Sequence, residues 1–351
     1  MQPEDQVIRY TELDGRSVAW SALGSGPPLF VGGWWSSHLE LDWRNPRFRG
    51  FVGQLAEHRT VIRYDRPGTG VSDRGVMPAR SLDGELATLE AIIDAAAPDS
   101  GTISLFGASS GGGVTSLFAA RHPERVDRLV LYGTYARGVD LAPPAARSTM
   151  LSIVEQHWGL GSRMLADLFL PDATAEERDE FVEFQRRTAS REVALASLQA
   201  AYEFDSTGHL GDVLAPTLVL HRRDDRAIPF ALGNDVATRI RNARFVALEG
   251  DDHFPWRGDA DAVVRETLAF LGAPVEAPRP TATPAGRSAH LTEREREVLR
   301  LVARGETDAE IASHLVLSAH TVHRHVANIR TKLGVPSRAA AAAWALRNDL
   351  I

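Results

Sequence analysis

Three side chains that lie far apart in the sequence have the types and order that acyl transfer needs. The stretch GASSG at 107–111 matches G-x-S-x-G, in which glycines flank a tight turn that leaves a serine hydroxyl accessible. A serine attacks a carbonyl only when a base takes its proton, and the base needs an acid to orient it. Asp225 and then His253 follow Ser109 along the chain. We therefore expect Ser109, Asp225 and His253 to form a catalytic triad.

Each of these residues also has a simpler interpretation. Ser109 could be a small residue in a tight turn, His253 a histidine on a surface loop, and Asp224 and Asp225 a pair of solvated turn residues. The triad is favoured because the motifs occur in one order and each follows an apolar run typical of a strand. Asp224 remains the alternative to Asp225 as the acid.

Acyl transfer by a serine also needs two backbone N–H groups that stabilise the negative charge formed on the substrate oxygen. One is expected from Ser110, the residue after the nucleophile, and the other from the loop after an earlier strand. In PLFVGGWWSSH at 28–38, Trp34 follows two glycines and is the second candidate. The bulky Trp34 and Trp35 would also narrow and dry the pocket.

Alternating strands and helices are expected to position these residues. Seven short runs rich in β-forming residues predict strands, and helical patterns such as SLDGELATLEAIIDAAA at 81–97 lie between several of them. The runs are 16–24, 28–33, 60–65, 102–107, 126–133, 216–221 and 243–250. This alternation is typical of a parallel sheet with helices on both faces, so an α/β fold is predicted.

A second domain is predicted after residue 271. The stretch 272–289 holds four prolines among small residues, which is the composition of a semi-extended linker. We therefore expect one domain at 1–271 and a small all-α domain at 290–351. The whole chain has a net charge of −7, but residues 290–351 hold nine Arg or Lys against seven Asp or Glu.

The second domain has the pattern of four short helices. Capping boxes of S/T-x-x-E spacing begin at Thr292 and Thr307, and Ser318 has the position of a helix N-cap. Apolar residues recur at helical spacing over 322–333 and leave the opposite face polar. The LVLS turn at 315–318 joins this helix to the preceding one, as in a helix-turn-helix.

The polar face of the third helix is expected to contact DNA. In a helix-turn-helix the second helix lies in the major groove, while helix N-termini and nearby cations bind phosphates. Residues 311–348 contain five cations and no Asp or Glu, which suits that role. A helical dimerisation module is the alternative. The expected DNA-binding residues are Thr307, Ser318, Thr321, His323, Arg324, Asn328 and Lys332.

Composition excludes several other classes. The 351 residues are 44% hydrophobic and 24% charged, as in an ordinary globular protein, and cysteine is absent. A disulfide framework and a thiolate metal site are therefore excluded, and we expect no metal ion and no cofactor. The first residues lack a secretory signal, and no apolar run approaches the roughly 20 residues of a membrane-spanning helix. We expect a cytoplasmic protein with no membrane partner.

Further motifs before residue 272 resemble the alpha/beta hydrolase superfamily. They are RYDRPGTGVSDR at 63–74 and HPERVDRLVLYGTYARG at 122–138. The Asp-x-x-Ile-Pro spacing from Asp225 to Pro229 is similar to the acid loop of that superfamily, which favours Asp225 over Asp224. The resemblance implies an alpha/beta hydrolase fold in which residues 139–212 form a helical cap over the pocket. Within this domain, the stretches GGWWSSHLELDW and GDDHFPWRGD look most like the hydrolase-like domains that are fused to cyclases and to DNA-binding domains.

Residues 291–346 resemble the LuxR-type DNA-binding domain almost end to end. The matching stretches are LTEREREVL, EIA, TVHRHV and KLGV, at the family spacing. That family commonly has Lys where His323 stands and Asn-Lys where Asp308 and Ala309 stand, so fewer phosphate contacts are implied here. Because one copy would bind DNA weakly, we expect a homodimer that contacts two half-sites.

Two functions fit this pair of domains. The favoured one is a transcription regulator whose hydrolase-like domain binds, and slowly hydrolyses, a small acyl, ester or lactone-like ligand. Its partners would be double-stranded DNA and that ligand, because a four-helix domain of this type has little use except on DNA. The alternative is an active serine esterase or lactonase with a DNA-tethering tail.

Overall fold

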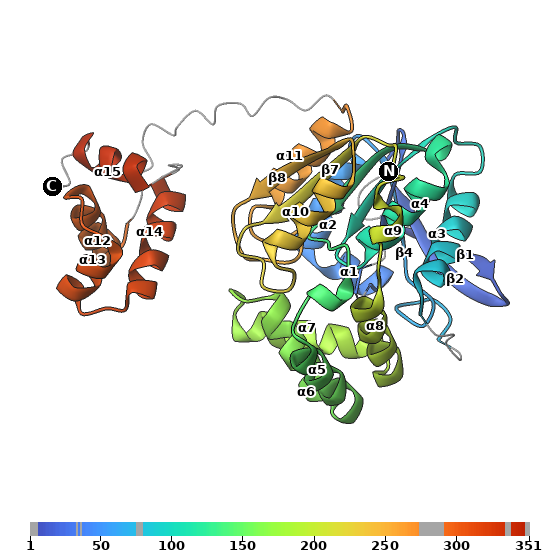
Figure 1. Ribbon diagram of the computed structural model, residues 1–351, viewed down its shortest axis with the longest axis horizontal. Coiled ribbons are helices and arrows are strands. Elements are labelled where there is room, and N and C mark those ends of the chain that lie inside the picture. Colours follow the sequence, from blue (N-terminus) through green and yellow to red (C-terminus); the bar gives the residue numbers. More distant parts are fainter. Residues whose placement is uncertain are drawn as a thin grey trace. The chain divides into compact units, whose positions relative to one another are not determined.

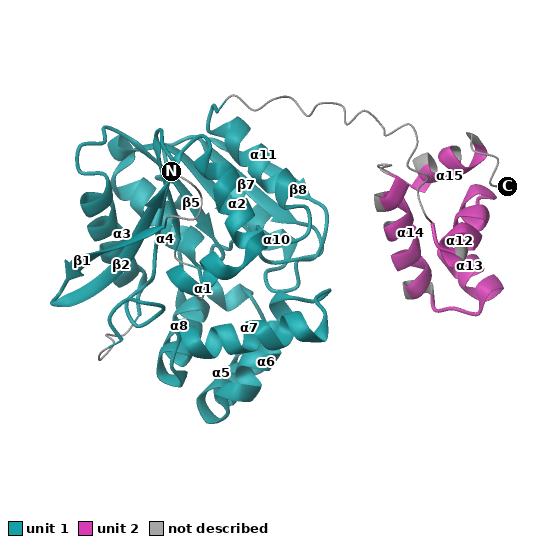
Figure 2. Cartoon of the chain, turned by 180° about the vertical axis from the view of Figure 1, so that it is seen from behind, with its two compact units in different colours: residues 1–275 teal, residues 276–351 magenta. Residues whose placement is uncertain are grey.

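The chain folds into two compact units, residues 1–275 and 276–351, in a computed structural model (Figure 2). The structure describes residues 6–32, 34–35, 37–74, 80–273, 291–333 and 338–347. Most of the expected linker, residues 274–289, lies outside the described residues, and its conformation stays a prediction.

The first unit is built on one eight-stranded sheet with the order β1-β2-β4-β3-β5-β6-β7-β8. The strands are β1 (Val7–Leu13), β2 (Arg16–Leu23), β3 (Pro28–Gly32), β4 (Thr60–Tyr64), β5 (Ile103–Ala108), β6 (Val126–Tyr132), β7 (Thr217–Arg222) and β8 (Ala243–Leu248). The six strands from β4 to β8 in this order are parallel, so their carboxyl ends meet at one edge. All seven predicted strands are present.

The prediction of a purely parallel sheet is wrong at one side. β2 pairs antiparallel with β4 and with β1, a strand that the sequence analysis missed. β1 is an edge strand without a buried residue, so it lacks the continuous apolar run of a buried strand. Its turn to β2 at Asp14 and Gly15 has φ values of 50° and 73°, as expected for an Asp-Gly hairpin. The sheet is therefore mixed.

Helices cover both faces of the sheet, and each face has its own apolar core. On one face pack α3 (Leu82–Ala96), α4 (Gly111–Arg121) and α10 (Phe230–Arg239), and on the other α2 (Pro46–Ala56) and α11 (Ala260–Phe270). Shorter elements are α1 (Leu39–Arg44), η1 (Pro123–Arg125), η2 (Gly138–Asp140) and α9 (Thr207–Leu210). Because both faces are covered, β5 and β7 are buried along their whole length.

Between β6 and β7 the chain leaves the sheet and forms four helices that gather together (Figure 1). They are α5 (Pro144–Gln156), α6 (Trp158–Phe169), α7 (Ala175–Thr188) and α8 (Arg191–Glu203). At the start of α7, Thr174 and Glu177 bond each other's backbone N–H in a capping box. The four helices occupy the segment in which a cap is expected.

The second unit contains four helices around a small core. They are α12 (Glu293–Ala303), α13 (Asp308–Leu315), α14 (Ala319–Leu333) and α15 (Arg338–Arg347). Both predicted capping boxes, at Thr292 and Thr307, are confirmed. The apolar stripe of α14 lies in the core through Val322, Val326 and Ile329. The opposite side of α14 is therefore left to solvent or a partner.

Candidate active site and candidate DNA-binding surface

Ser109 lies at the sharp turn between β5 and α4. Its φ is 54°, a left-handed conformation that costs a non-glycine residue about 1–2 kcal/mol. The turn is held by neighbouring backbone, since Ser109 N–H donates to Tyr132 O at 3.0 Å and Thr134 Oγ1 donates to Ser109 O at 2.7 Å. A Cβ at Gly107 would collide with the Thr115 side chain. The motif therefore forms the strand-turn-helix that its glycines predict.

The three predicted triad side chains are joined by hydrogen bonds. His253 Nε2 lies 3.1 Å from Ser109 Oγ, and His253 Nδ1 lies 2.9 Å from Asp225 Oδ2. The other carboxylate oxygen, Oδ1, accepts from the N–H groups of Ala227 and Ile228 at 2.9 and 3.1 Å. These bonds fix the carboxylate so that one oxygen faces the imidazole. The arrangement has the geometry that activates a serine hydroxyl.

The two candidate acids differ in burial and in contact with the histidine. Asp225 is buried and contacts His253, whereas Asp224 is exposed. The Asp-x-x-Ile-Pro spacing therefore indicated the residue that meets the histidine.

A buried arginine that sequence analysis missed holds the loop that carries His253. Arg222, at the end of β7, donates from Nε to Tyr132 Oη at 2.7 Å and from Nη2 to Arg257 O at 2.5 Å. The residue is only 1% exposed, so these bonds lie in a dry environment where they are strong. The sequence gives no local signal for them because the partners are 90 and 35 residues away.

Both candidate oxyanion residues lie near the serine. Trp34 is buried and lines the same small cavity as Ser109, and Ser110 is the N-cap of α4, where the helix dipole favours negative charge. Arg66 holds the tryptophan loop by donating to Trp35 O at 2.7 Å. Arg66 is itself buried beside Glu85, 3.6 Å away. The loop is thus anchored by a buried ion pair.

The space next to the triad is nearly closed. A cavity of about 10 Å³ is lined by Trp34, Ser109, His253 and two aromatic rings, Phe169 and Phe254. This volume is about what one water molecule needs. The Phe169 ring stacks on the His253 imidazole with centroids 5.4 Å apart. Phe169 comes from α6, so the helices inserted after β6 contribute directly to the wall around the triad.

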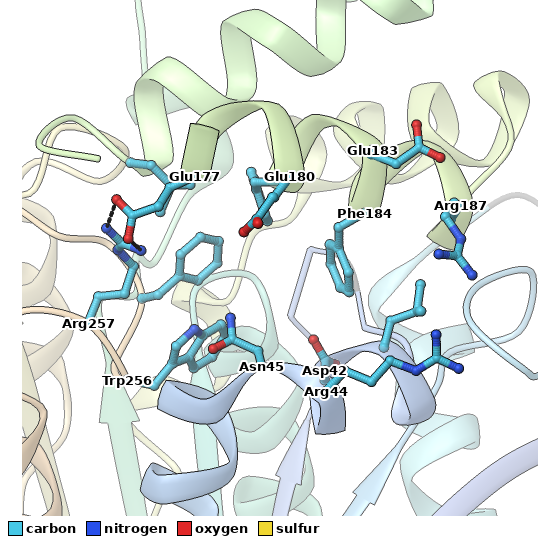
Figure 3. A pocket seen from close by; sticks show the side chains of 14 residues that line it. Asp42, Arg44, Asn45, Glu177, Glu180, Glu183, Phe184, Arg187, Trp256 and Arg257 are labelled. Atoms are coloured by element: carbon cyan, nitrogen blue, oxygen red, sulfur yellow. Dashed lines mark hydrogen bonds and ion pairs between the residues drawn. The ribbon is translucent and has the colours of Figure 1, made fainter. Parts of the chain in front are cut away.

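A much larger cleft is lined by residues of α1 and α7 (Figure 3). We call it the α1–α7 cleft. It has a volume of about 550 Å³. Its walls are Leu41, Asp42, Arg44, Asn45, Leu170, Glu177, Glu180, Phe181, Glu183, Phe184, Arg187, Phe254, Trp256 and Arg257. Phe254 belongs to both linings, so its ring forms part of the wall between cleft and triad.

Burial shifts the titration of groups around this cleft. Burial raises the pKa of the Asp42 carboxyl to about 7, although Arg63 opposes the shift. Burial also lowers the pKa of His38 to about 4, and Arg74, Arg187 and Arg44 add to this effect. His38 is therefore neutral at pH 7.

The part of the chain that the structure describes contains no cluster of three or more His, Cys, Asp or Glu side chains that could hold a metal ion. Within the same residues, no helix has both the length and the apolar character needed to cross a bilayer.

The candidate DNA-binding residues gather at the start of two helices and along α14. Thr307 caps α13, and Ser318 accepts from Thr321 N–H at 3.0 Å at the start of α14. Arg324 and Asn328 are exposed on α14. These five residues therefore lie at positions from which helix N-termini and an exposed helix face could reach DNA.

Two of the five cations in residues 311–348 are already paired with acids. Lys332 Nζ lies 2.7 Å from Glu295, and Arg338 forms an ion pair with Asp308. His323, with a side chain 78% exposed, lies 3.4 Å from the same Asp308. These pairs cross between helices, so the count of cations along the sequence overstated the positive charge available for phosphates.

Comparison with known proteins agrees with both parts of the fold. Residues 29–266 match the Alpha/beta hydrolase family, and residues 289–345 match the luxR family of bacterial regulatory proteins. The chain therefore belongs to the alpha/beta hydrolase family and carries a C-terminal luxR-type helix-turn-helix domain. The predicted fold class is confirmed.

The similar proteins include a pair of hydrolases and an enol-lactonase. A 2-hydroxy-6-oxo-2,4-heptadienoate hydrolase from Pseudomonas putida is 30% identical over 202 residues, covering 53% of this chain and 68% of its own. A 2-hydroxymuconate semialdehyde hydrolase from the same species is 31% identical over 234 residues, covering 62% and 78%. The crystal structure of an enol-lactonase from Burkholderia xenovorans has a TM-score of 0.62 at 22% identity, covering 75% of this chain and 100% of its own. The last likeness is one of fold.

Proposed function

We propose that this protein is a DNA-binding transcription regulator whose hydrolase-type domain binds, and slowly hydrolyses, a small acyl, ester or lactone-like ligand. The observation that carries the proposal is the presence in one chain of a luxR-type helix-turn-helix domain and a hydrogen-bonded Ser109-His253-Asp225 set. Ligand occupancy in the first domain would then change the DNA affinity of the second. The protein would act in the cytoplasm as a homodimer.

The reaction at Ser109 would follow the serine hydrolase pathway. His253 takes the hydroxyl proton while Ser109 Oγ attacks the acyl carbon, and Asp225 stabilises the imidazolium. The amides of Trp34 and Ser110 would hold the oxyanion. The bond from the acyl carbon to the leaving oxygen then breaks, and His253 gives its proton to that oxygen. In the second half His253 takes a proton from water, which attacks the acyl carbon, and returns it to Ser109 Oγ as the acid is released. The closed cavity next to Ser109 supports a slow reaction, because substrate must first displace the rings that fill the site.

DNA binding is tested with a gel shift on the region upstream of the protein's own gene. Arg324→Ala should weaken the shift, whereas Arg304→Ala, which removes an exposed charge at the end of α12, should leave it unchanged. Equal shifts for wild type and Arg324→Ala would contradict the assignment of α14. A thermal-shift screen then identifies ligands, and each hit is tested for its effect on the affinity for DNA.

An active esterase or lactonase with a DNA-tethering tail is the second candidate. The assembled triad favours it, because a receptor needs no nucleophile. Hydrolysis of short-chain aryl esters by wild type and Ser109→Ala separates the candidates. Fast hydrolysis that depends on Ser109, together with DNA affinity that no ligand changes, would establish the esterase and reject the regulator.

A further inference from the structure

The α1–α7 cleft has a charge arrangement that the triad reaction does not require. Apolar side chains form part of its lining, and the volume of about 550 Å³ suits a small organic molecule. The apolar lining consists of Leu41, Leu170, Phe181, Phe184, Phe254 and Trp256. An apolar body of that size would therefore be buried on binding, with the free-energy gain that apolar burial brings.

The two ends of the cleft differ in charge. At one end Arg257 contacts Glu177 at 3.4 Å and Asp252 at 3.1 Å, and Arg47 contacts Glu177 at 2.5 Å. Two arginines there meet two carboxylates, so their charges balance. At the other end Arg44 of α1 and Arg187 of α7 approach each other across the cleft (Figure 3). Neither arginine forms an ion pair with another described residue. Two guanidinium groups brought together without an anion repel each other.

The acids that line the cleft do not neutralise this end. Figure 3 places Glu180 between Glu177 and Phe184, away from the two arginines, and Glu183 turns its carboxylate away from the floor. Asp42 lies on the floor, but burial raises the pKa of its carboxyl to about 7, which removes part of its negative charge at neutral pH. The Arg44 and Arg187 end therefore stays cationic.

The same two arginines also affect a buried histidine. Burial is the main reason that the pKa of His38 falls to about 4; Glu40 opposes this shift, and Arg74, Arg187 and Arg44 lower the pKa further. The charges of these arginines therefore converge on one region of the domain. An anionic group placed in the cleft would be attracted to that region and could accept hydrogen bonds from two planar guanidinium groups.

We propose that the α1–α7 cleft binds an amphipathic organic acid, with its carboxylate between Arg44 and Arg187 and its apolar body against the Phe184 and Phe254 rings. Because Phe254 also lines the cavity beside Ser109, the far end of the ligand lies next to the triad. This inference rests on the proposed function, because it takes the cleft as the ligand site of the hydrolase-type domain. It adds an acidic group to the small acyl, ester or lactone-like ligand of that proposal.

The test measures binding of phenylalkanoates, from phenylacetate to 6-phenylhexanoate, by calorimetry with the full-length protein. Each acid is compared with the alcohol of the same length, which keeps the apolar body and removes the charge. At least one acid should bind at least about tenfold more tightly than its alcohol, as expected for charge-assisted hydrogen bonds. The double variant Arg44→Ala/Arg187→Ala should lose this preference.

Arg186→Ala is the matched control, because Arg186 is the exposed neighbour of Arg187 and does not line the cleft. It should keep the acid preference, and unchanged thermal unfolding would show that all variants fold. Absence of an acid preference across the series, or its survival in the double variant, overturns the proposal. Ser109→Ala should keep the preference too, so a failure of hydrolysis at Ser109 is distinguished from a failure of the acid site.

Discussion

Replacing Asp225 with Asn should abolish the reactivity of Ser109 without unfolding the protein. Oδ1 of Asp225 accepts two backbone hydrogen bonds, at 2.9 and 3.1 Å, and an Asn side chain can keep both. Its NH₂ group would then take the place of Oδ2, 2.9 Å from His253 Nδ1. A donor there forces the imidazole proton onto Nε2, which lies 3.1 Å from Ser109 Oγ and could no longer accept the hydroxyl proton.

The expected loss is about 10⁴-fold, the effect of the wrong histidine tautomer in a serine-histidine-aspartate triad, or roughly 5 kcal/mol of activation free energy. The assay is the rate at which a fluorophosphonate labels Ser109, with the modified residue identified by mass spectrometry. Asp224→Asn is the control, since it changes the neighbouring exposed carboxylate. Labelling of Asp225→Asn at the wild-type rate, or an equal loss in Asp224→Asn, would refute the reasoning.

Three further predictions concern strain, pH and DNA. Ser109→Gly should be more stable to urea than Ser109→Ala by up to about 1 kcal/mol, because glycine adopts the φ of 54° without strain; equal stabilities would exclude strain at this turn. Burial raises the pKa of Asp42 from 3.8 to about 7, so folding takes up a proton at pH values between these two. The unfolding free energy should therefore fall by up to about 4 kcal/mol as the pH rises from about 4 to about 7. Urea denaturation at pH 4 and pH 8 should show that Asp42→Asn lacks this decrease, and an unchanged decrease would contradict the buried, protonated carboxyl. In DNA titrations at several salt concentrations, Arg324→Ala should lower the salt slope by about one, and Lys332→Ala should change it less because Glu295 already pairs that charge; equal changes would show that the ion pair opens on DNA.

The sequence could indicate that these three side chains meet because each of them follows a parallel strand. Ser109, Asp225 and His253 are far apart along the chain, but the strands before them end at one edge of the sheet. A local motif and this rule of sheet topology are therefore enough to predict that the three side chains lie close together. The capping boxes of the second unit were equally accessible, since both partners of each box lie within four residues.

Features set by distant contacts were not predictable in the same way. Phe169 stacks on His253 from an inserted helix, and the spacing of its own helix gives no sign of that contact. Lys332 and Glu295 are 37 positions apart, so counting the charges within one segment of the sequence gives no sign that they pair. The hairpin of β1 is different, because its Asp14-Gly15 turn is a local feature of the sequence. The strand itself lacks the apolar run that predicts a buried strand.

The cavity beside Ser109 has room for about one water molecule, so the proposed ligand would have to part the Phe169 and Phe254 rings to reach the serine. The free energy of that opening would be subtracted from the free energy that contact releases. Small or weakly apolar metabolites, which release little, would therefore occupy the site only at high concentration. Discrimination among ligands at this site would thus come first from the free energy of opening the cavity and second from the fit of the ligand to the opened space.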